Sequence, residues 1–240
     1  MAGVDIGRKR WKNATAPIDW SHPSAAGLHA MVVTDGTARI VEKVRGLTPD
    51  TITPTSTRTV SKLGYAATFP NSTTVGGAVW SLTSIPYLAP PLTLHCVYTP
   101  STIHDSSIAN VGGSSTNGVG WRLGVTDTNI ANLRMTFFGV ADYDVTGALV
   151  AGVELAVTIS ISGGTATFYK NASVISSQAV GTPVTTNQTD GLGIGCHRRL
   201  SANTSGPSNT PISMVALWNR PMGQSEVAAL NTDPFCMLRN

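Results

Sequence analysis

The chain has 240 residues, of which 41% are hydrophobic and only 12% are charged, and its formal net charge is +3. This hydrophobic share supplies a buried core and excludes a disordered chain, and the length fits one large domain. No continuous basic stripe with interleaved aromatic residues is present, and no window is apolar enough to span a membrane, so neither nucleic acid nor lipid is a predicted partner.

Residues 1–24 are polar and show no strand pattern, which predicts an extended N-terminal arm before a domain at residues 25–240. The arm holds six candidate protein-docking residues: Arg8, Lys9, Arg10, Trp11, Lys12 and Trp20. A basic terminus of this kind either contacts an acidic surface or is simply solvated. The first twenty residues lack the apolar core of a signal peptide, so synthesis in a cytoplasm is expected.

The body of the chain alternates short strand patterns with turn signals such as Asp35-Gly36 and Gly112-Gly113. The predicted strands are 29–34, 37–44, 57–62, 65–69, 77–82, 92–99, 107–111, 119–126, 130–138, 153–161, 165–169, 173–180, 191–196 and 212–218. Many short strands without a repeat period predict two packed antiparallel sheets.

One hairpin is especially clear in the sequence. Apolar residues alternate with small or polar ones over 153–161, Gly163-Gly164 forms the turn, and the return strand ends at Asn171. Asparagine is one of the few residues that tolerate the left-handed conformation, so Asn171 is expected to close the next turn.

The C-terminal stretch is the most informative one. Residues 212–218 are apolar on both faces, which predicts a strand buried within stacked layers. Pro221 and Gly223 end this strand, and a short helix follows, with Ser225 as its predicted cap, Glu226 in its first turn and Pro234 as its stop.

This ending resembles the concanavalin A-like (laminin-G-like) jelly-roll superfamily, and within it the copies encoded by phage virion genes. In those proteins an aromatic-Asn-Arg sequence, here Trp218-Asn219-Arg220, precedes a helix with Glu-x-x-x-Leu and a Pro-aromatic pair, here Pro234-Phe235. The segment 18–28 is similar to their opening. The resemblance implies an all-β, two-sheet antiparallel sandwich with an N-terminal arm and one short C-terminal helix.

The superfamily includes glycoside hydrolases, which need two closely placed carboxylates. The Glu-x-Asp-x-x-Glu motif of its glucanases is absent, and the three glutamates, Glu42, Glu154 and Glu226, are scattered. Asp142 and Asp144 would share a face on a strand, but the pattern fits a polar loop as well. No Gly-x-Ser-x-Gly elbow occurs either. The sequence therefore predicts that the protein is not an enzyme.

Neither a cofactor nor a metal is predicted. Cys96, Cys196 and Cys236 form no CxxC pair, which disfavours zinc, although a disulfide between two of them stays open. Relatives often bind calcium through loop acids and amides, for which the candidates are Asp127, Asn129, Asp142, Asp144 and Asp190. Calcium is not predicted, because Ser213 replaces an aspartate that often begins the terminal strand in the superfamily.

The resemblance favours a structural virion protein of a tailed phage, most concretely a capsid decoration protein that binds the major capsid protein and sister copies as a homo-oligomer. The alternative is a glycan-binding adhesin on the capsid or a tail fibre. For that role Tyr143 is the expected exposed platform, flanked by Asp142 and Asp144, because Trp80, Trp121 and Trp218 lie in strand patterns typical of core residues.

Overall fold

The fold is known from a computed structural model of the chain. It describes residues 16–34, 39–53, 57–61, 63–69, 77–101, 107–113, 120–125, 131–186, 188, 190–196 and 210–238. The predicted docking residues Arg8 to Lys12 and the calcium candidates Asp127 and Asn129 lie outside these ranges. Among the described residues, no helix is long and apolar enough to cross a membrane.

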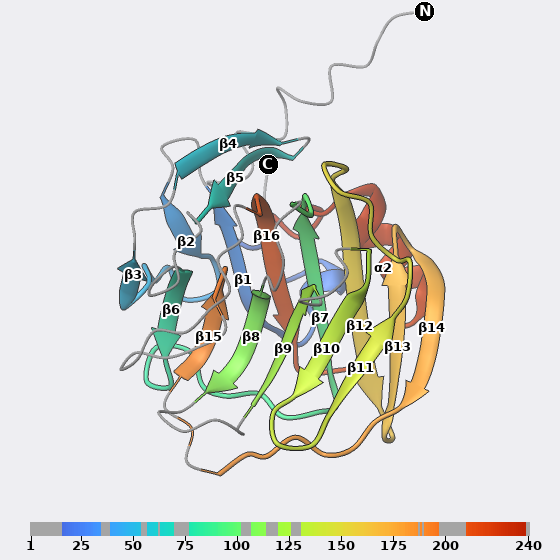
Figure 1. The fold of residues 1–240 in the computed structure, drawn as a ribbon. Coiled ribbons are helices and arrows are strands. Elements are labelled where there is room, and N and C mark those ends of the chain that lie inside the picture. The colour runs from blue at the N-terminus through green and yellow to red at the C-terminus, as the bar shows by residue number, and fades with distance from the viewer. Residues whose placement is uncertain are drawn as a thin grey trace, which may run out of the picture.

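Nine strands form the first antiparallel sheet (Figure 1). Along the sheet they are β14 (Ser173–Ala179), β13 (Thr165–Lys170), β12 (Leu155–Ser162), β7 (Leu92–Tyr98), β16 (Ile212–Trp218), β1 (Leu28–Thr34) and β2 (Ile40–Glu42), with β5 (Gly64–Thr68) joined to β16 and β4 (Thr57–Ser61) to β5. The clear hairpin of the sequence is β12–β13, and its register pairs Ser162 with Thr165 across the glycine turn.

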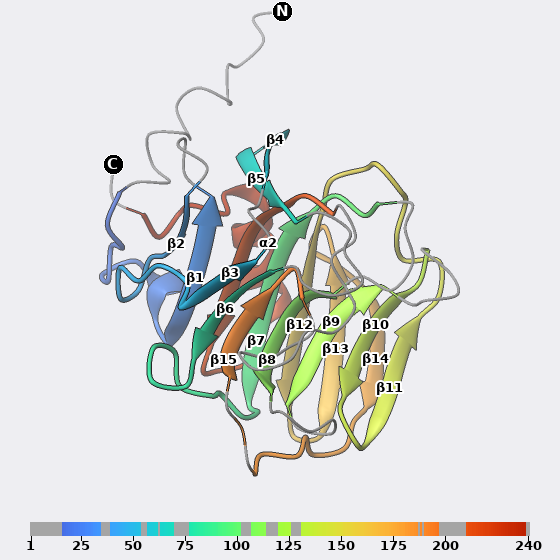
Figure 2. The same cartoon turned by 60° about the vertical axis from the view of Figure 1, so that its left-hand side comes forward.

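Seven strands form the second antiparallel sheet, which lies across the first (Figure 2). In order they are β11 (Ala141–Val145), β10 (Leu133–Phe137), β9 (Trp121–Val125), β8 (Ser107–Gly113), β15 (Asp190–Ile194), β6 (Gly77–Ser81) and β3 (Thr51–Thr53). The predicted all-β sandwich is therefore confirmed.

The main core fills the space between the two sheets. Alternate residues of each strand point into it because successive side chains of a strand face opposite ways. Strand β7, for example, contributes Leu92, Leu94, Cys96 and Tyr98, all fully buried. Trp80 and Trp121 enter from the second sheet and are also fully buried, which confirms their predicted core role.

A third layer covers the outer face of the nine-stranded sheet. It contains the short helix η1 (Pro23–Ala25) and the helix α2 (Gln224–Thr232), and α2 lies on the side of this sheet away from the second one (Figure 1). Trp218 is buried in this layer, and its Nε1–H donates to the Ser24 carbonyl over 2.7 Å. Strand β16 therefore has two buried faces, as its apolar sequence predicts.

The described part of the predicted arm belongs to this third layer. Ile18 is buried and forms a β-bridge with Leu238, and the Asp19 N–H donates to the Met237 carbonyl over 2.8 Å. His22 caps η1, as its Nδ1 accepts from the Ser24 N–H at 3.2 Å. Residues 16–24 thus pack on the sandwich rather than extending from it.

Two strands and one helix cap differ from the sequence-based prediction. Strand β3 lies where no strand was predicted, and β11 occupies a stretch that was also absent from the predicted strands and was read as a polar loop. The cap of α2 is Gly223 instead of Ser225, and the Gly223 N–H donates to the Glu226 carboxylate over 3.1 Å. The position of Glu226 in the first turn is confirmed and suits the positive end of the helix dipole.

Candidate functional site

The outward side chains of the seven-stranded sheet are polar over strands β8 to β11; those of β11 are exposed, whereas every residue of β8 is buried. On β9 and β10 the inward side chains are apolar core residues, so Arg122, Arg134 and Thr136 point outward between them. Asp142 and Asp144 on β11 stand opposite Thr136 and Arg134 on the same face. Two guanidinium groups, two carboxylates and a hydroxyl therefore share one surface.

Arg134 joins the two aspartates into one ionic group. Its Nε and Nη2 donate to the Asp144 carboxylate over 2.7 and 2.8 Å, and its Nη1 lies 3.0 Å from Asp142 Oδ2. Thr136 Oγ1 donates to the other Asp142 oxygen over 2.7 Å. The hydrogen bonds from Arg134 hold the pKa of the Asp144 carboxyl below its ordinary value. The pair on β11 is therefore an ion-paired edge of the surface.

Arg122 is the second guanidinium on this face. Its Nη1 lies 3.3 Å from Ser107 Oγ, and its Cζ lies 5.9 Å from the centre of the Phe138 ring. Asn110 is its cross-strand neighbour on β8, and the Asn110 carboxamide donates to the Gly112 carbonyl over 3.0 Å. Within the described part of the chain, Asn110 Oδ1 is buried without a hydrogen-bond partner. Gly193 lies beside it, where a Cβ would collide with this carboxamide.

Tyr143 differs from its predicted position as an exposed platform. It lies on the opposite face of β11 from Asp142 and Asp144, half-buried against the main core. Its ring packs edge-on against Phe137 with 5.5 Å between ring centres, and its hydroxyl accepts from the Gly181 N–H over 2.8 Å. The cause is strand geometry, since the residue between two outward side chains must point inward.

The sequence-based prediction overlooked Arg122, Ser107 and Asn110. The alternating pattern could have identified Arg122, which stands between the two core residues Trp121 and Leu123 and must therefore point outward.

Trp20 is the one predicted docking residue within the described ranges, and its side chain is 54% exposed. The three cysteines are free thiols, so the disulfide that the sequence left open does not form in this structure.

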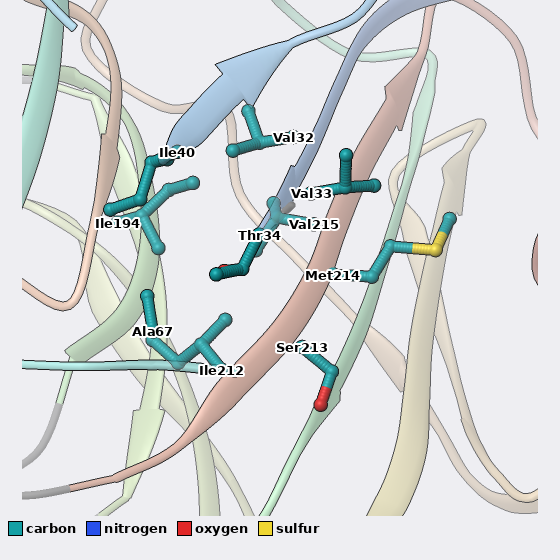
Figure 3. A pocket seen from close by; sticks show the side chains of 10 residues that line it. All are labelled: Val32, Val33, Thr34, Ile40, Ala67, Ile194, Ile212, Ser213, Met214 and Val215. Carbon is teal, nitrogen blue, oxygen red and sulfur yellow. The ribbon is translucent and has the colours of Figure 1, made fainter. Parts of the chain in front are cut away.

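Two hollows elsewhere in the structure lack the polar groups or the volume to bind a sugar. Figure 3 shows the first, where Ile40, Ala67 and Ile194 gather beside β1 and β16; it holds about 10 Å³, no more than one water. The second, of about 230 Å³, lies between the Pro90-Pro91 segment and the Gly163-Gly164 turn, and none of the described residues that line it is charged.

Metal ligands are not assembled in the described ranges. There, no group of three or more His, Cys, Asp or Glu residues is placed to hold an ion. Of the calcium candidates, Asp142 and Asp144 are paired with Arg134, and Asp190 is fully buried at the start of β15.

Comparison with solved structures finds the same fold in proteins of low sequence identity. A sialidase of Trypanosoma rangeli bound to 2,3-difluorosialic acid has a TM-score of 0.65 and 16% identity, over 97% of this chain and 38% of that chain. The Ruminococcus gnavus IT-sialidase CBM40, also solved bound to alpha2,3 sialyllactose, has a TM-score of 0.53 and 16% identity, over 68% of this chain and 96% of that chain.

This chain thus spans well under half of the sialidases it matches, and at this identity the likeness concerns the fold alone. A search of curated protein sequences finds no match. The family model of the concanavalin A-like lectin/glucanases superfamily matches residues 85–228, which is more than half of the chain. The chain therefore belongs to the concanavalin A-like lectin/glucanases superfamily.

Proposed function

We propose that the protein is a glycan-binding module whose binding surface is the outer face of strands β8 to β11. The observation that carries the proposal is Arg122, which is held on this polar face beside Ser107 and Phe138. Sugars present hydroxyl and carboxylate groups. On this face Arg122 and Arg134 supply donors, and the exposed Asp142 and Asp144 supply acceptors. The surface is built on strands, so its side chains keep fixed positions relative to each other.

The same chemistry favours an acidic sugar. A guanidinium is planar and donates two parallel hydrogen bonds to a carboxylate, which makes arginine the usual partner of that group. Arg122 and Arg134 place two such groups on this face. Arg134 is paired with Asp142 and Asp144, and the Phe138 ring lies 5.9 Å from the Arg122 Cζ. The likeness to a CBM40 solved with sialyllactose supports the same class of ligand, a glycan that carries sialic acid.

Binding without hydrolysis is part of the proposal. A glycosidase needs a general acid whose pKa is raised. The guanidinium of Arg134 instead lowers the pKa of Asp144, the opposite of what a general acid requires. Asp142 is paired with Arg134 and accepts a hydrogen bond from the Thr136 hydroxyl. We therefore propose that both carboxylates act as ionised hydrogen-bond acceptors and not as proton donors.

A structural role in a phage virion is a second proposal, and the exposed Trp20 favours it. An indole that is 54% exposed on the N-terminal segment offers an apolar anchor of the kind that dominates protein interfaces. It would dock the module on a capsid protein or on a sister copy. Electron microscopy of virions with and without a Trp20→Ala substitution tests this role, and full retention of the variant would contradict it.

The glycan proposal is tested by screening the full chain on a glycan array and then titrating α2,3-sialyllactose against lactose. We expect binding that requires the sialic acid, and an Arg122→Gln variant should weaken it at least about tenfold, as expected for a charged hydrogen-bond partner. Arg45→Gln is the matched control, because Arg45 bonds the His29 carbonyl in the nine-stranded sheet. No bound glycan at all, or equal affinity of wild type and Arg122→Gln, would refute the proposal.

A further inference from the structure

Strand β8 contains a β-bulge at Ile108. Ser107 pairs with Gly124 of β9, and Ala109 pairs with Leu123, so β8 uses three residues where β9 uses two. Ile108 is the extra residue. Successive side chains of a regular strand face opposite ways, so one extra residue inverts the alternation on the far side of the bulge.

The bulge places the Ser107 side chain on the outward face of the second sheet. Ile108 and Ala109 both belong to the main core, although they are neighbours in the chain. Asn110 faces outward opposite Arg122. In a regular strand the alternation that starts at Asn110 would turn Ser107 toward the core. Because of the extra residue, Ser107 Oγ instead lies on the outward face and accepts from Arg122 Nη1 over 3.3 Å.

Ser107 is a rigid partner for a flexible side chain. It is only 1% exposed and lies on a strand with neighbours on both sides, β9 and β15. The Phe138 ring, 5.9 Å from the Arg122 Cζ, is a second fixed contact. An arginine side chain has many rotamers, and these two contacts restrict them before any ligand arrives.

We propose that Ser107 is a positioning residue of the glycan-binding face, placed there by the bulge at Ile108, and that it acts through Arg122. This inference rests on the proposed glycan function. An arginine that is already ordered loses less conformational freedom when it donates to a ligand carboxylate, so affinity is gained without a further ligand contact.

The binding test is a calorimetric titration of the full chain and two Ser107 variants with α2,3-sialyllactose. Ser107→Ala removes the hydroxyl and should weaken binding about fivefold, the factor expected when one rotamer-rich side chain must be ordered on binding. Ser107→Thr keeps the hydroxyl on a residue that suits strands, and it should restore most of the affinity.

The matched control is Ser160→Ala. Ser160 is also a buried serine, 7% exposed, and its Oγ accepts from the Met222 N–H over 3.0 Å in the other sheet. Its loss removes a comparable hydrogen bond from the fold, so it should lower the melting temperature about as much as Ser107→Ala does. It should leave glycan affinity unchanged. Thermal unfolding of each variant confirms that it folds.

A second readout needs no glycan. Relaxation of the Arg122 Nε–H signal in ¹⁵N NMR reports the picosecond-to-nanosecond motion of its side chain. We expect this motion to increase in Ser107→Ala and to stay at the wild-type level in Ser107→Thr and Ser160→Ala.

The two readouts separate failure of this inference from failure of the glycan function. If wild type binds no glycan but Arg122 is more mobile in Ser107→Ala alone, the glycan function fails and the positioning of Arg122 stands. Ser107 is not a positioning residue if Arg122 is equally mobile in wild type and Ser107→Ala. The same holds if Ser107→Ala binds sialyllactose as wild type does, or if Ser160→Ala weakens binding equally.

Discussion

His95 shows how one buried residue links the sandwich to its outer layer. It points from β7 toward the third layer, is fully buried, and its Nδ1 lies 2.8 Å from Thr158 Oγ1. Burial lowers the pKa of the imidazole to about 4, because the charged form would lose its water. The partner of this histidine, Thr158, lies directly opposite it on the neighbouring strand β12.

We predict that His95 makes the protein less stable in mild acid. The unfolded chain takes up a proton near pH 6.5, whereas the folded one does so only near pH 4. The free energy of unfolding should therefore fall as pH drops from 6.5 to 4, by up to about 3 kcal/mol, and level off below. Urea unfolding at several pH values measures this, and a His95→Gln variant should show a flatter curve. Parallel curves for the two proteins would contradict the prediction.

Glu42 is a residue whose role no sequence pattern revealed. It is fully buried, and its carboxylate accepts from the backbone N–H groups of Met31, Val44 and Arg45 over 3.2, 2.8 and 2.8 Å. It thus ties the turn after β2 to β1. A carboxylate that satisfies distant backbone donors depends on tertiary placement, so the sequence showed it only as one of three scattered glutamates.

At the scale of elements, the prediction succeeded where a segment has strong periodicity. Strands β12, β13 and β16 were placed within a residue or two, because their apolar patterns are long and their turns carry glycine. Strand β11 was missed because its two aspartates are poor strand formers. In the structure it is paired along its length with β10, and Arg134 of that strand binds both aspartates. Such pairing is set by the register of β10 and β11, which a single sequence does not reveal.

Helix α2 is too short to be stable alone, so its packing must hold it. Leu230 is fully buried in the outer layer with Trp218 and Val227. We predict that Leu230→Ala lowers the free energy of unfolding by about 3 kcal/mol, through lost burial and the cavity left behind. It should also speed amide exchange across α2.

Chemical denaturation and hydrogen exchange measure these two effects. Ala229→Ser, on the exposed side of the same helix, is the control and should change the stability by less than about 0.5 kcal/mol. A loss below about 1 kcal/mol for Leu230→Ala would show that the outer layer contributes little to the fold.

The whole molecule has two differently built outer faces. One face of the sandwich is covered by residues 16–25, α2 and residues 235–238, and the other carries the polar side chains of β8 to β11 (Figures 1 and 2). The fold class could be predicted because the alternating patterns and the terminal strand demand stacked sheets. The surface could not, because Ser107, Arg122 and Thr136 meet only through pairing between strands that the sequence leaves unspecified.

The most direct test of the proposed glycan-binding face is to map amide chemical-shift changes by NMR while α2,3-sialyllactose is added to the full chain. We predict saturable shifts centred on Ser107, Arg122 and Thr136. This prediction would be contradicted by the absence of shifts, or by shifts centred on Gly163, Gly164 and Thr182, which line the hollow at the end of the β12–β13 hairpin.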